Sequence, residues 1–334
     1  MLLILTVGAL ATPGFISTPS IAALLTSISF IGCVAVGMTF ITLSGNIMSL
    51  CLGATLAASS LIFMAGLSFG VGPALALALG FGTLFTAAQG LLVGYLRANP
   101  IIVSIASLAL LVGSADFLTG GQRIYSPGDS LVPLTGTLWG IPVEVLFILA
   151  SAGIGQIILS YTRFGRHIHM VGSNLKAARA AGVSIWRTVT GSYLLAGFFT
   201  ALAGILLSAR YGSGDMELGV GYDYDAIAAV LVGGTAIHGG QGSVMRTLLG
   251  VAVVSATQVV LLLHGFSQQM QYLMTGLIVL TVIMLHSLGR DTHEFFQNDH
   301  LRVVSPLCRS LGSHCDPGSG GSGKRQFPER GHRF

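Results

Sequence analysis

Long apolar segments, separated by short polar connections, take up most of this chain. Only 8% of the residues are charged, against about 25% in soluble domains. The apolar runs are continuous, whereas the strands of an outer-membrane β-barrel alternate between apolar and polar residues. Since about twenty apolar residues cross a bilayer as a helix, residues 1–290 are predicted to form an all-α, polytopic transmembrane domain of about ten helices. The runs lie at 2–12, 21–43, 47–68, 71–96, 101–119, 142–161, 189–209, 224–238, 243–264 and 268–287.

Two of these runs, the first and the eighth, are too short to cross a bilayer unaided. The eighth ends in a cluster of glycines, which predicts a half-helix that breaks inside the membrane. Such a break is tolerated only where it is buried in protein or lines a water-filled cavity. We therefore expect the cluster to have a structural role; its members are Gly233, Gly234, Gly239, Gly240 and Gly242.

The connection between Thr162 and Thr188 is strongly basic and contains neither Asp nor Glu. Basic connections stay on the cytoplasmic side of a membrane, so this loop is predicted to be cytoplasmic and the connection 120–141 external. With an even number of spans, both termini are then cytoplasmic. The basic residues of the loop are Arg163, Arg166, Lys176, Arg179 and Arg187.

A short helix is predicted inside this loop, from Ser173 to Ala181. Ser173 is a suitable N-cap, and Gly182 suits the left-handed position just past a helix end. The helix carries several alanines, so its small side chains would fit into a cleft on a partner, as amphipathic helices fit into grooves. The alternative is a surface helix that lies on lipid headgroups, held there by its basic residues.

Residues 291–334 are polar, rich in Gly, Ser, His and Arg, and predicted to be a disordered cytoplasmic tail. The tail contains a run, Gly318–Arg325, that nearly spells a phosphate-binding loop. That motif requires Ser or Thr after the lysine and a strand before the loop, and here Arg325 follows Lys324. The run is therefore interpreted as a flexible segment without nucleotide-binding function.

The sequence offers no catalytic, cofactor-binding, metal-binding or nucleic-acid-binding motif. Acids within spans usually mark proton-coupled or ion-coupled transport. The candidates Asp116, Asp223 and Asp225 lie near the predicted outer ends of their runs, and we expect them to be solvated interface residues. This scarcity of intramembrane charge indicates that energy for uphill transport comes from another chain. The alternatives are an ion-coupled secondary transporter or facilitator and, third, a membrane-embedded enzyme.

Four segments carry a resemblance to a known family. They are Met38–Phe40 with Ser44–Ile47, Gly90–Val93 with Asn99–Val103, a loop segment with Phe164–His167, Gly172, Asn174, Ala177–Arg179 and Ala181–Val183, and Asp225–Val230 with Gly233–Thr235 and Gly239–Gly242. Over residues 20–288 the chain resembles the permease subunits of ribose/xylose/galactoside-type ABC sugar importers. One departure is Met48, which stands where such permeases usually have an acid.

The resemblance implies a transport subunit of the bacterial cytoplasmic membrane that does not itself hydrolyse ATP. Its expected partners are a cytoplasmic ATP-binding subunit, a second permease subunit in a homodimer or heterodimer, and an external solute-binding protein. Its coupling helix would correspond to Ser173, Asn174, Ala177, Ala178, Arg179, Ala181 and Gly182. The polar candidates for a solute path are Ser44, Asn46, Gln89 and Asn99; the alternative for each is an interhelical hydrogen bond. Gly90 and Gly94 are expected to serve close helix packing within one subunit.

Overall fold

The computed structural model describes residues 17–46, 48–125, 136–138, 141–281 and 284. The chain divides into two compact units, Met1–Val282 and Ile283–Phe334, and the helices and strands with assigned bounds lie in the first. The first apolar run, 2–12, and the predicted tail, 291–334, lie outside the described residues.

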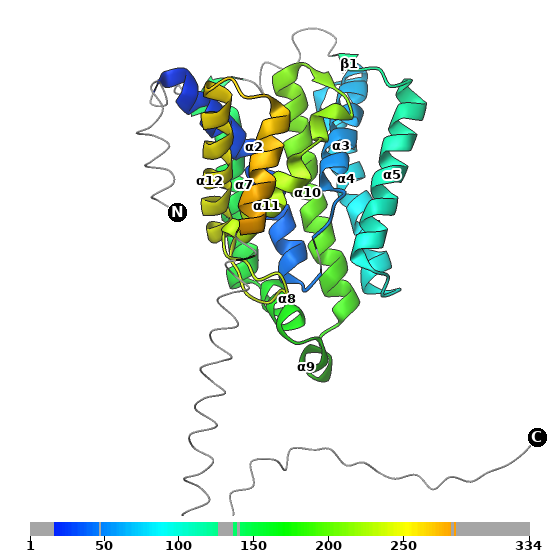
Figure 1. Cartoon of the computed structure of the whole chain (residues 1–334). Helices are drawn as coiled ribbons and strands as arrows, with labels where there is room; N and C mark the ends of the chain where they lie inside the picture. Colours follow the sequence, from blue (N-terminus) through cyan, green and yellow to red (C-terminus); the bar gives the residue numbers. More distant parts are fainter. Residues whose placement is uncertain (1–16, 47, 126–135, 139–140, 282–283, 285–334) are drawn as a thin grey trace, which may run out of the picture. The chain divides into compact units, whose positions relative to one another are not determined.

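The described part of the first unit is predominantly helical (Figure 1). Its long helices are α2 (Thr18–Leu43), α3 (Leu52–Gly66), α4 (Val71–Gly94), α5 (Pro100–Thr119), α7 (Val143–Tyr161), α10 (Ile185–Tyr211) and α12 (Val244–Leu263). The shorter elements are α8 (Arg163–Ser173), α9 (Leu175–Ala180), α11 (Tyr222–Val232), the 3₁₀ turns η1 (Leu67–Phe69) and η2 (Glu217–Gly219), and a helix over 268–281. Strand β1 (Ile124–Tyr125) pairs with β4 (Ser213–Gly214), and β2 (Thr137–Leu138) with β3 (Ile141–Pro142), both antiparallel.

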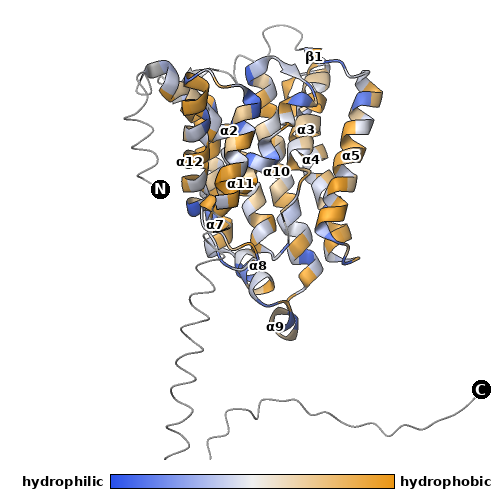
Figure 2. Cartoon of the chain, in the orientation of Figure 1, coloured by the Kyte–Doolittle hydropathy of each residue, from blue (hydrophilic) through white to orange (hydrophobic). Residues whose placement is uncertain are grey.

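Seven helices in the described residues are long and apolar enough to cross a membrane. They correspond to seven of the ten predicted runs. The eighth run forms α11, which has only 11 residues, and the described helix of the tenth run covers 268–281. Figure 2 shows hydrophobic residues along the lengths of the long helices, with hydrophilic residues near several of their ends.

Proline, asparagine and glycine set helix ends where the sequence places them. Helix α5 begins at Pro100, whose missing N–H is not needed in a first turn. The Oδ1 atom of Asn99 accepts a hydrogen bond from the Ile101 backbone N–H, 3.0 Å away. Gly120 ends the helix with a left-handed φ of 64°. The polar candidate Asn99 is thus an exposed cap.

Helix α10 forms the centre of the unit and packs against α2, α3 and α4. Glycines on α4 permit the close approach: a Cβ at Gly90 would lie 2.6 Å from the Tyr193 Cβ and 3.0 Å from the Thr190 Cα, and one at Gly94 would lie 3.1 Å from the Trp186 Cα. The expectation that these two glycines pack helices within one subunit is confirmed. The outer helix α5 is the least buried of the seven.

The expectation that all three acids are solvated is wrong for two of them. Asp116 is exposed, but the exposed fractions of Asp223 and Asp225 are only 9% and 6%. Helix α3 begins at Leu52, after a non-helical stretch from Ser44, so its first N–H groups need acceptors inside the unit. The Oδ1 atom of Asp223 accepts a hydrogen bond from the Gly53 backbone N–H. Asp223 therefore caps a helix of another segment, and that requirement explains its burial.

Substitution of Gly90 by Ala tests the packing of α4 on α10. A methyl group there would lie too close to the Tyr193 side chain and to the Thr190 Cα of α10, so we expect Gly90→Ala to lower the free energy of unfolding by about 1–3 kcal/mol. Gly80→Ala in the same helix is the matched control, because no atom lies within 4 Å of its Cβ position and alanine favours a helix. Urea titration in detergent measures both variants, and equal stability of the two would contradict this packing.

Candidate functional site

Helix α8 is an amphipathic helix that anchors the basic connection to the unit. Its N-cap Thr162 accepts a hydrogen bond from the Gly165 N–H at 3.1 Å. Gly165, Ile168 and Val171 form its buried face, whereas Arg163 is exposed. Only one helix was predicted in this connection, and α8 was not, although apolar residues at positions three apart indicate it.

The N-cap of helix α9 lies one residue later than predicted. Its N-cap is Asn174, whose Oδ1 atom accepts hydrogen bonds from the N–H groups of Lys176 and Ala177 at 3.1 and 3.0 Å. Ser173 is instead the last residue of α8, and its hydroxyl donates to the His169 carbonyl oxygen at 2.7 Å. The prediction that Ser173 caps this helix is therefore wrong.

The end of α9 agrees with the prediction. Gly182 has a φ of 76°, the left-handed conformation that glycine adopts without a steric cost. The N–H of Val183 donates to the Ala178 carbonyl at 3.0 Å, and that of Gly182 to the Arg179 carbonyl at 3.1 Å. This pair of bonds forms a Schellman motif, which fixes the exit of the chain from α9 into α10.

The two sides of α9 differ in what surrounds them. Ala178 is 2% exposed and packs with Val171 and Val183, so its small side chain serves the internal packing of this chain. At 100° per residue, Ala180 lies on the opposite side of the helix. Ala180, which the sequence analysis did not select, is exposed. So are Lys176, Ala177, Arg179 and Ala181.

Close backbone contacts join the ends of α2 and α8 to the segment that follows α11. We call Leu43, Gly45, Gly172, Gly239 and Gly240 the glycine junction. The Gly240 N–H donates to the Leu43 carbonyl oxygen at 3.0 Å, and a Cβ at Gly172 would collide with both of these backbone groups. A Cβ at Gly239 would lie 2.5 Å from the Gly45 Cα. Side chains larger than hydrogen would separate the three segments.

A histidine adds a bond between α8 and the same segment. The Nδ1 atom of His169 lies 2.9 Å from the Gly240 carbonyl oxygen. Gly239 and Gly240 have φ values of 85° and 77°, so both a positive φ and close contact require glycine at these positions. Helix α8, and with it the base of α9, is thereby attached to the end of α2.

The other glycines of the predicted cluster shape the end of α11. A Cβ at Gly233 would lie 2.6 Å from the Arg246 carbonyl oxygen, so glycine lets the end of α11 lie against the start of α12. Gly234 turns the chain with a φ of 77°. Gly242 contacts Thr235, which a Cβ would approach to 2.7 Å.

The structure does not bring the four candidate path residues together. Ser44 and Asn46 line a cavity of about 680 Å³ at the α9 end of the unit, and the Asn46 Nδ2 atom donates to the Ser44 hydroxyl at 2.8 Å. Gln89 is 3% exposed, and its Nε2 atom lies 3.4 Å from the Cys51 Sγ atom. Asn99 caps α5.

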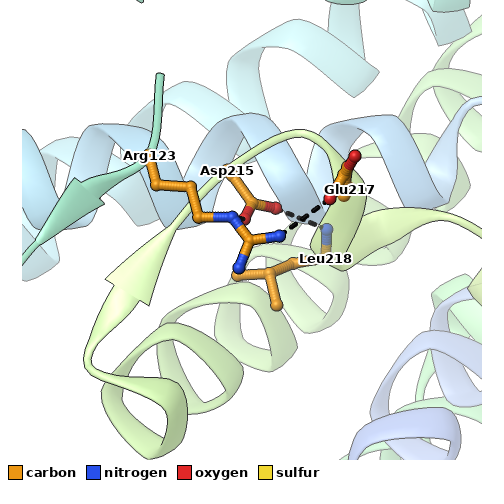
Figure 3. Close-up of polar contacts among 4 residues, drawn as sticks. All are labelled: Arg123, Asp215, Glu217 and Leu218. Atoms are coloured by element: carbon orange, nitrogen blue, oxygen red, sulfur yellow. Dashed lines mark hydrogen bonds and ion pairs between the residues drawn. The ribbon is translucent and has the colours of Figure 1, made fainter. Parts of the chain in front are cut away.

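At the opposite end of the long helices from α9, ion pairs tie the connections together (Figures 1 and 3). Arg123 contacts Asp215 at 2.7 Å and Glu217 at 2.8 Å, and the Asp215 Oδ1 atom accepts a hydrogen bond from the Leu218 N–H at 2.8 Å. These bonds raise the pKa of Arg123 above its usual value. In the described residues, no group of three His, Cys, Asp or Glu side chains has an arrangement that would hold a metal ion.

The sequence is similar to known membrane transport subunits over most of its length. It is 33% identical to the ribose import permease protein RbsC of Bacillus subtilis (strain 168), over 85% of this chain and 90% of the relative. It is 36% identical to the inner membrane ABC transporter permease protein YjfF of Escherichia coli (strain K12), over 74% and 76%. The autoinducer 2 import system permease protein LsrD of Yersinia pseudotuberculosis is 30% identical over 80% and 83%.

No solved structure gives a significant match to the chain. The family described as branched-chain amino acid transport system / permease component matches residues 20–283. That range includes α8, α9 and every residue of the glycine junction. The chain therefore belongs to this family of transport-system permease components.

Proposed function

We propose that this protein is the membrane-spanning subunit of an ATP-driven importer of a monosaccharide or a similar small polar solute. The observation that carries the proposal is α9, a short exposed helix fixed to the end of α2 through the glycine junction. The solute class is supported by the names of relatives that import ribose and autoinducer 2, although the family description names branched-chain amino acids. The proposed location is the bacterial cytoplasmic membrane.

In this proposal α9 is the coupling helix that a separate cytoplasmic ATP-binding subunit contacts. Its exposed side presents Lys176, Ala177, Arg179 and Ala180, a small and basic surface suited to a cleft in a partner. Ala178 supports this surface from within by packing under the helix. Ser173 and Asn174 connect α9 to α8, and Ala181 and Gly182 connect it to α10.

In this proposal, the glycine junction transmits a movement of α9 to the long helices. Since α8 packs on the unit through Ile168 and Val171, its movement pulls on Gly172 and His169. These contact Gly240, which is bonded to Leu43 at the end of α2. The residues that follow, Ser44 and Asn46, line the cavity. A docking event would therefore change the α9 end of the solute path.

Further partners belong to the same proposal. A second permease subunit, identical or homologous, would complete the membrane domain. An external solute-binding protein would dock at the opposite end of the helices from α9, where the connections carry Arg123, Asp215 and Glu217.

An ion-coupled secondary transporter is the second candidate, and the burial of Asp223 and Asp225 favours it. The bond from the Gly53 N–H gives Asp223 a structural role, which argues for ATP-driven transport. Proteoliposomes that contain the assembled transporter separate the two. Uptake that requires internal ATP and persists in the presence of proton and sodium ionophores supports our proposal, whereas uptake that collapses with the ion gradient supports the second candidate.

The orientation of the chain follows from its basic residues and can be tested by labelling. We expect α9 to face the cytoplasm, because basic connections are retained there. In a cysteine-free variant, Lys176→Cys should react with an impermeant maleimide only after the cells are opened, and Gln122→Cys, an exposed residue at the β1 end, should react in intact cells. The reverse pattern would refute the orientation.

Replacement of one alanine on each side of α9 by tryptophan distinguishes the roles of the two sides. Ala180→Trp should abolish co-purification with the ATP-binding subunit, because the exposed side would no longer fit a cleft. It should leave thermal stability unchanged. Ala178→Trp should lower thermal stability instead, because overpacking a buried position costs about 1–3 kcal/mol. Ala180→Ser is the conservative control, and full co-purification of Ala180→Trp would show that this side of α9 is not the contact.

Substitution of His169 tests the glycine junction. His169→Ala removes the bond to the Gly240 carbonyl oxygen, a contribution of about 0.5–1.5 kcal/mol. Solute uptake should fall several-fold while the ATP-binding subunit still co-purifies. His167→Ala, in the same helix, is the matched control, since no bond of the His167 side chain corresponds to that of His169. Equal uptake by both variants would remove the junction from the coupling route.

A further inference from the structure

The cavity at the α9 end is lined in part by arginines, for which a path for a neutral solute gives no reason. Besides Ser44 and Asn46, its lining includes Arg97 from the α4–α5 turn and Arg179 from α9. Its volume of about 680 Å³ lies within the range of roughly 300–1,000 Å³ that is usual for small-molecule sites. We refer to it as the arginine cavity.

None of the described residues that line the arginine cavity is acidic. Arg97 and Arg179 are exposed, and the ion pairs among the described residues join Arg123 and Arg210 to acids at the β1 end. A third cation is near, because the Arg187 guanidinium lies 5.2 Å from the centroid of the Trp186 ring, and Trp186 lines the cavity. Within the described part of the chain, the cavity therefore carries positive charge that no acidic side chain balances.

The backbone at Arg97 is held in an unusual conformation. Its φ of 54° is left-handed, and no other non-glycine residue among those described has a positive φ. Strained residues of this kind gather at binding and catalytic sites, where the surrounding structure maintains them. The residue with this conformation is one of the two arginines that line the cavity.

The remaining lining suits a polyhydroxylated ring. Tyr95 and Trp186 form an edge-to-face pair with centroids 6.4 Å apart, and both are exposed. Gly94 lets Trp186 approach the end of α4. Aromatic faces pack against the apolar face of a sugar, while the Asn46 amide supplies an oxygen and a second N–H for hydrogen bonds. The Ser44 hydroxyl already donates to the Ile41 carbonyl oxygen and accepts from Asn46, so it orients this amide.

We propose that the arginine cavity binds a phosphate monoester of a small polyhydroxylated molecule, such as a sugar phosphate. Arg97 and Arg179 would bind the phosphate, because guanidinium groups form charge-assisted pairs with its oxygens. The sugar part of this inference and its effect on uptake rest on the proposed function, whereas the binding of phosphate does not. A ligand that bridges Arg97 and Arg179 holds α9 against the turn between α4 and α5, so an occupied site opposes movement of α9 and lowers uptake.

Tryptophan fluorescence of the full chain tests this site directly. The chain has two tryptophans, so Trp139→Phe leaves Trp186 as the single reporter. In neutral detergent, we expect ribose 5-phosphate to change the fluorescence saturably, inorganic phosphate to act more weakly, and ribose at the same concentration to have no effect. The binding should weaken as ionic strength rises, since charge pairs at an open site are screened.

Substitutions of single cations identify the binding groups. Arg97→Asn and Arg179→Gln should each weaken ribose 5-phosphate binding by about tenfold, the usual effect of losing one charged hydrogen bond. Asparagine tolerates the left-handed backbone at residue 97, so that variant keeps the turn. The matched control is Arg163→Gln, an exposed cation of α8 that does not line the cavity, and its binding should be unchanged.

The outcomes separate the sources of phosphate. A response in nanodiscs only when phosphatidylglycerol is present, with none to ribose 5-phosphate, would assign the cavity to a lipid headgroup and overturn the proposal. Equal responses to inorganic phosphate and ribose 5-phosphate would overturn the sugar part. A third outcome would also overturn the proposal: the parent protein binds no ligand, and Arg97→Asn no longer co-purifies with the ATP-binding subunit. The cavity would then be a contact site for an acidic residue of that subunit. Binding is measured on the isolated subunit, so failure of the coupling proposal would leave this result intact.

Discussion

The contact between the Gly240 N–H and the Leu43 carbonyl oxygen sets the arrangement of the whole α9 end. Backbone groups of three segments meet there without intervening side chains, and Gly45, Gly172 and Gly239 make this geometrically feasible. A bond between backbones depends less on side-chain rotamers than a contact between long side chains does. In the proposed function, a movement of α8 would therefore be transmitted directly to α2, as a coupling element requires.

At the start of α3, a side chain rather than a backbone group makes the contact between two distant segments. Helix α3 starts after a non-helical stretch, so its first N–H groups point into protein, and Asp223 of α11 satisfies one of them. Glycine allows the two segments to approach, since a Cβ at Gly53 would lie 2.7 Å from the Asp223 Oδ2 atom. A buried acid in an apolar chain is here a structural cap between segments distant in sequence. Its burial alone does not mark an ion-coupling site.

The sequence predicted features that depend on local chemistry. Apolar run length located the seven described helices that are long and apolar enough to cross a membrane, and the requirement of a left-handed residue after a helix identified Gly182. The prediction for Ser173 failed because two adjacent residues compete to cap the same helix. The Ser173 hydroxyl reaches back to the His169 carbonyl, which leaves Asn174 to accept the first N–H groups of α9.

Features that depend on tertiary contacts could not be derived from the sequence in this way. The burial of Asp223 is determined by where α3 begins, and the inward position of Ala178 by Val171 and Val183. Ser44, Asn46, Gln89 and Asn99 share polarity but not location, because two line the arginine cavity, one is buried beside Cys51 and one caps α5. Polarity in a membrane chain identifies groups that need partners, and only the fold identifies which partners they have.

The distribution of ion pairs gives the two ends of the helices different properties. At the β1 end, Arg123 is neutralised by Asp215 and Glu217, and these pairs hold β1, β4 and η2 together. At the α9 end, Arg97 and Arg179 have no acidic partner among the described residues. Desolvating a cation without an opposite charge is costly, so these arginines remain exposed unless an anionic group covers them. The basic residues from which the orientation is predicted thus also leave the α9 end able to bind an anion or an acidic surface.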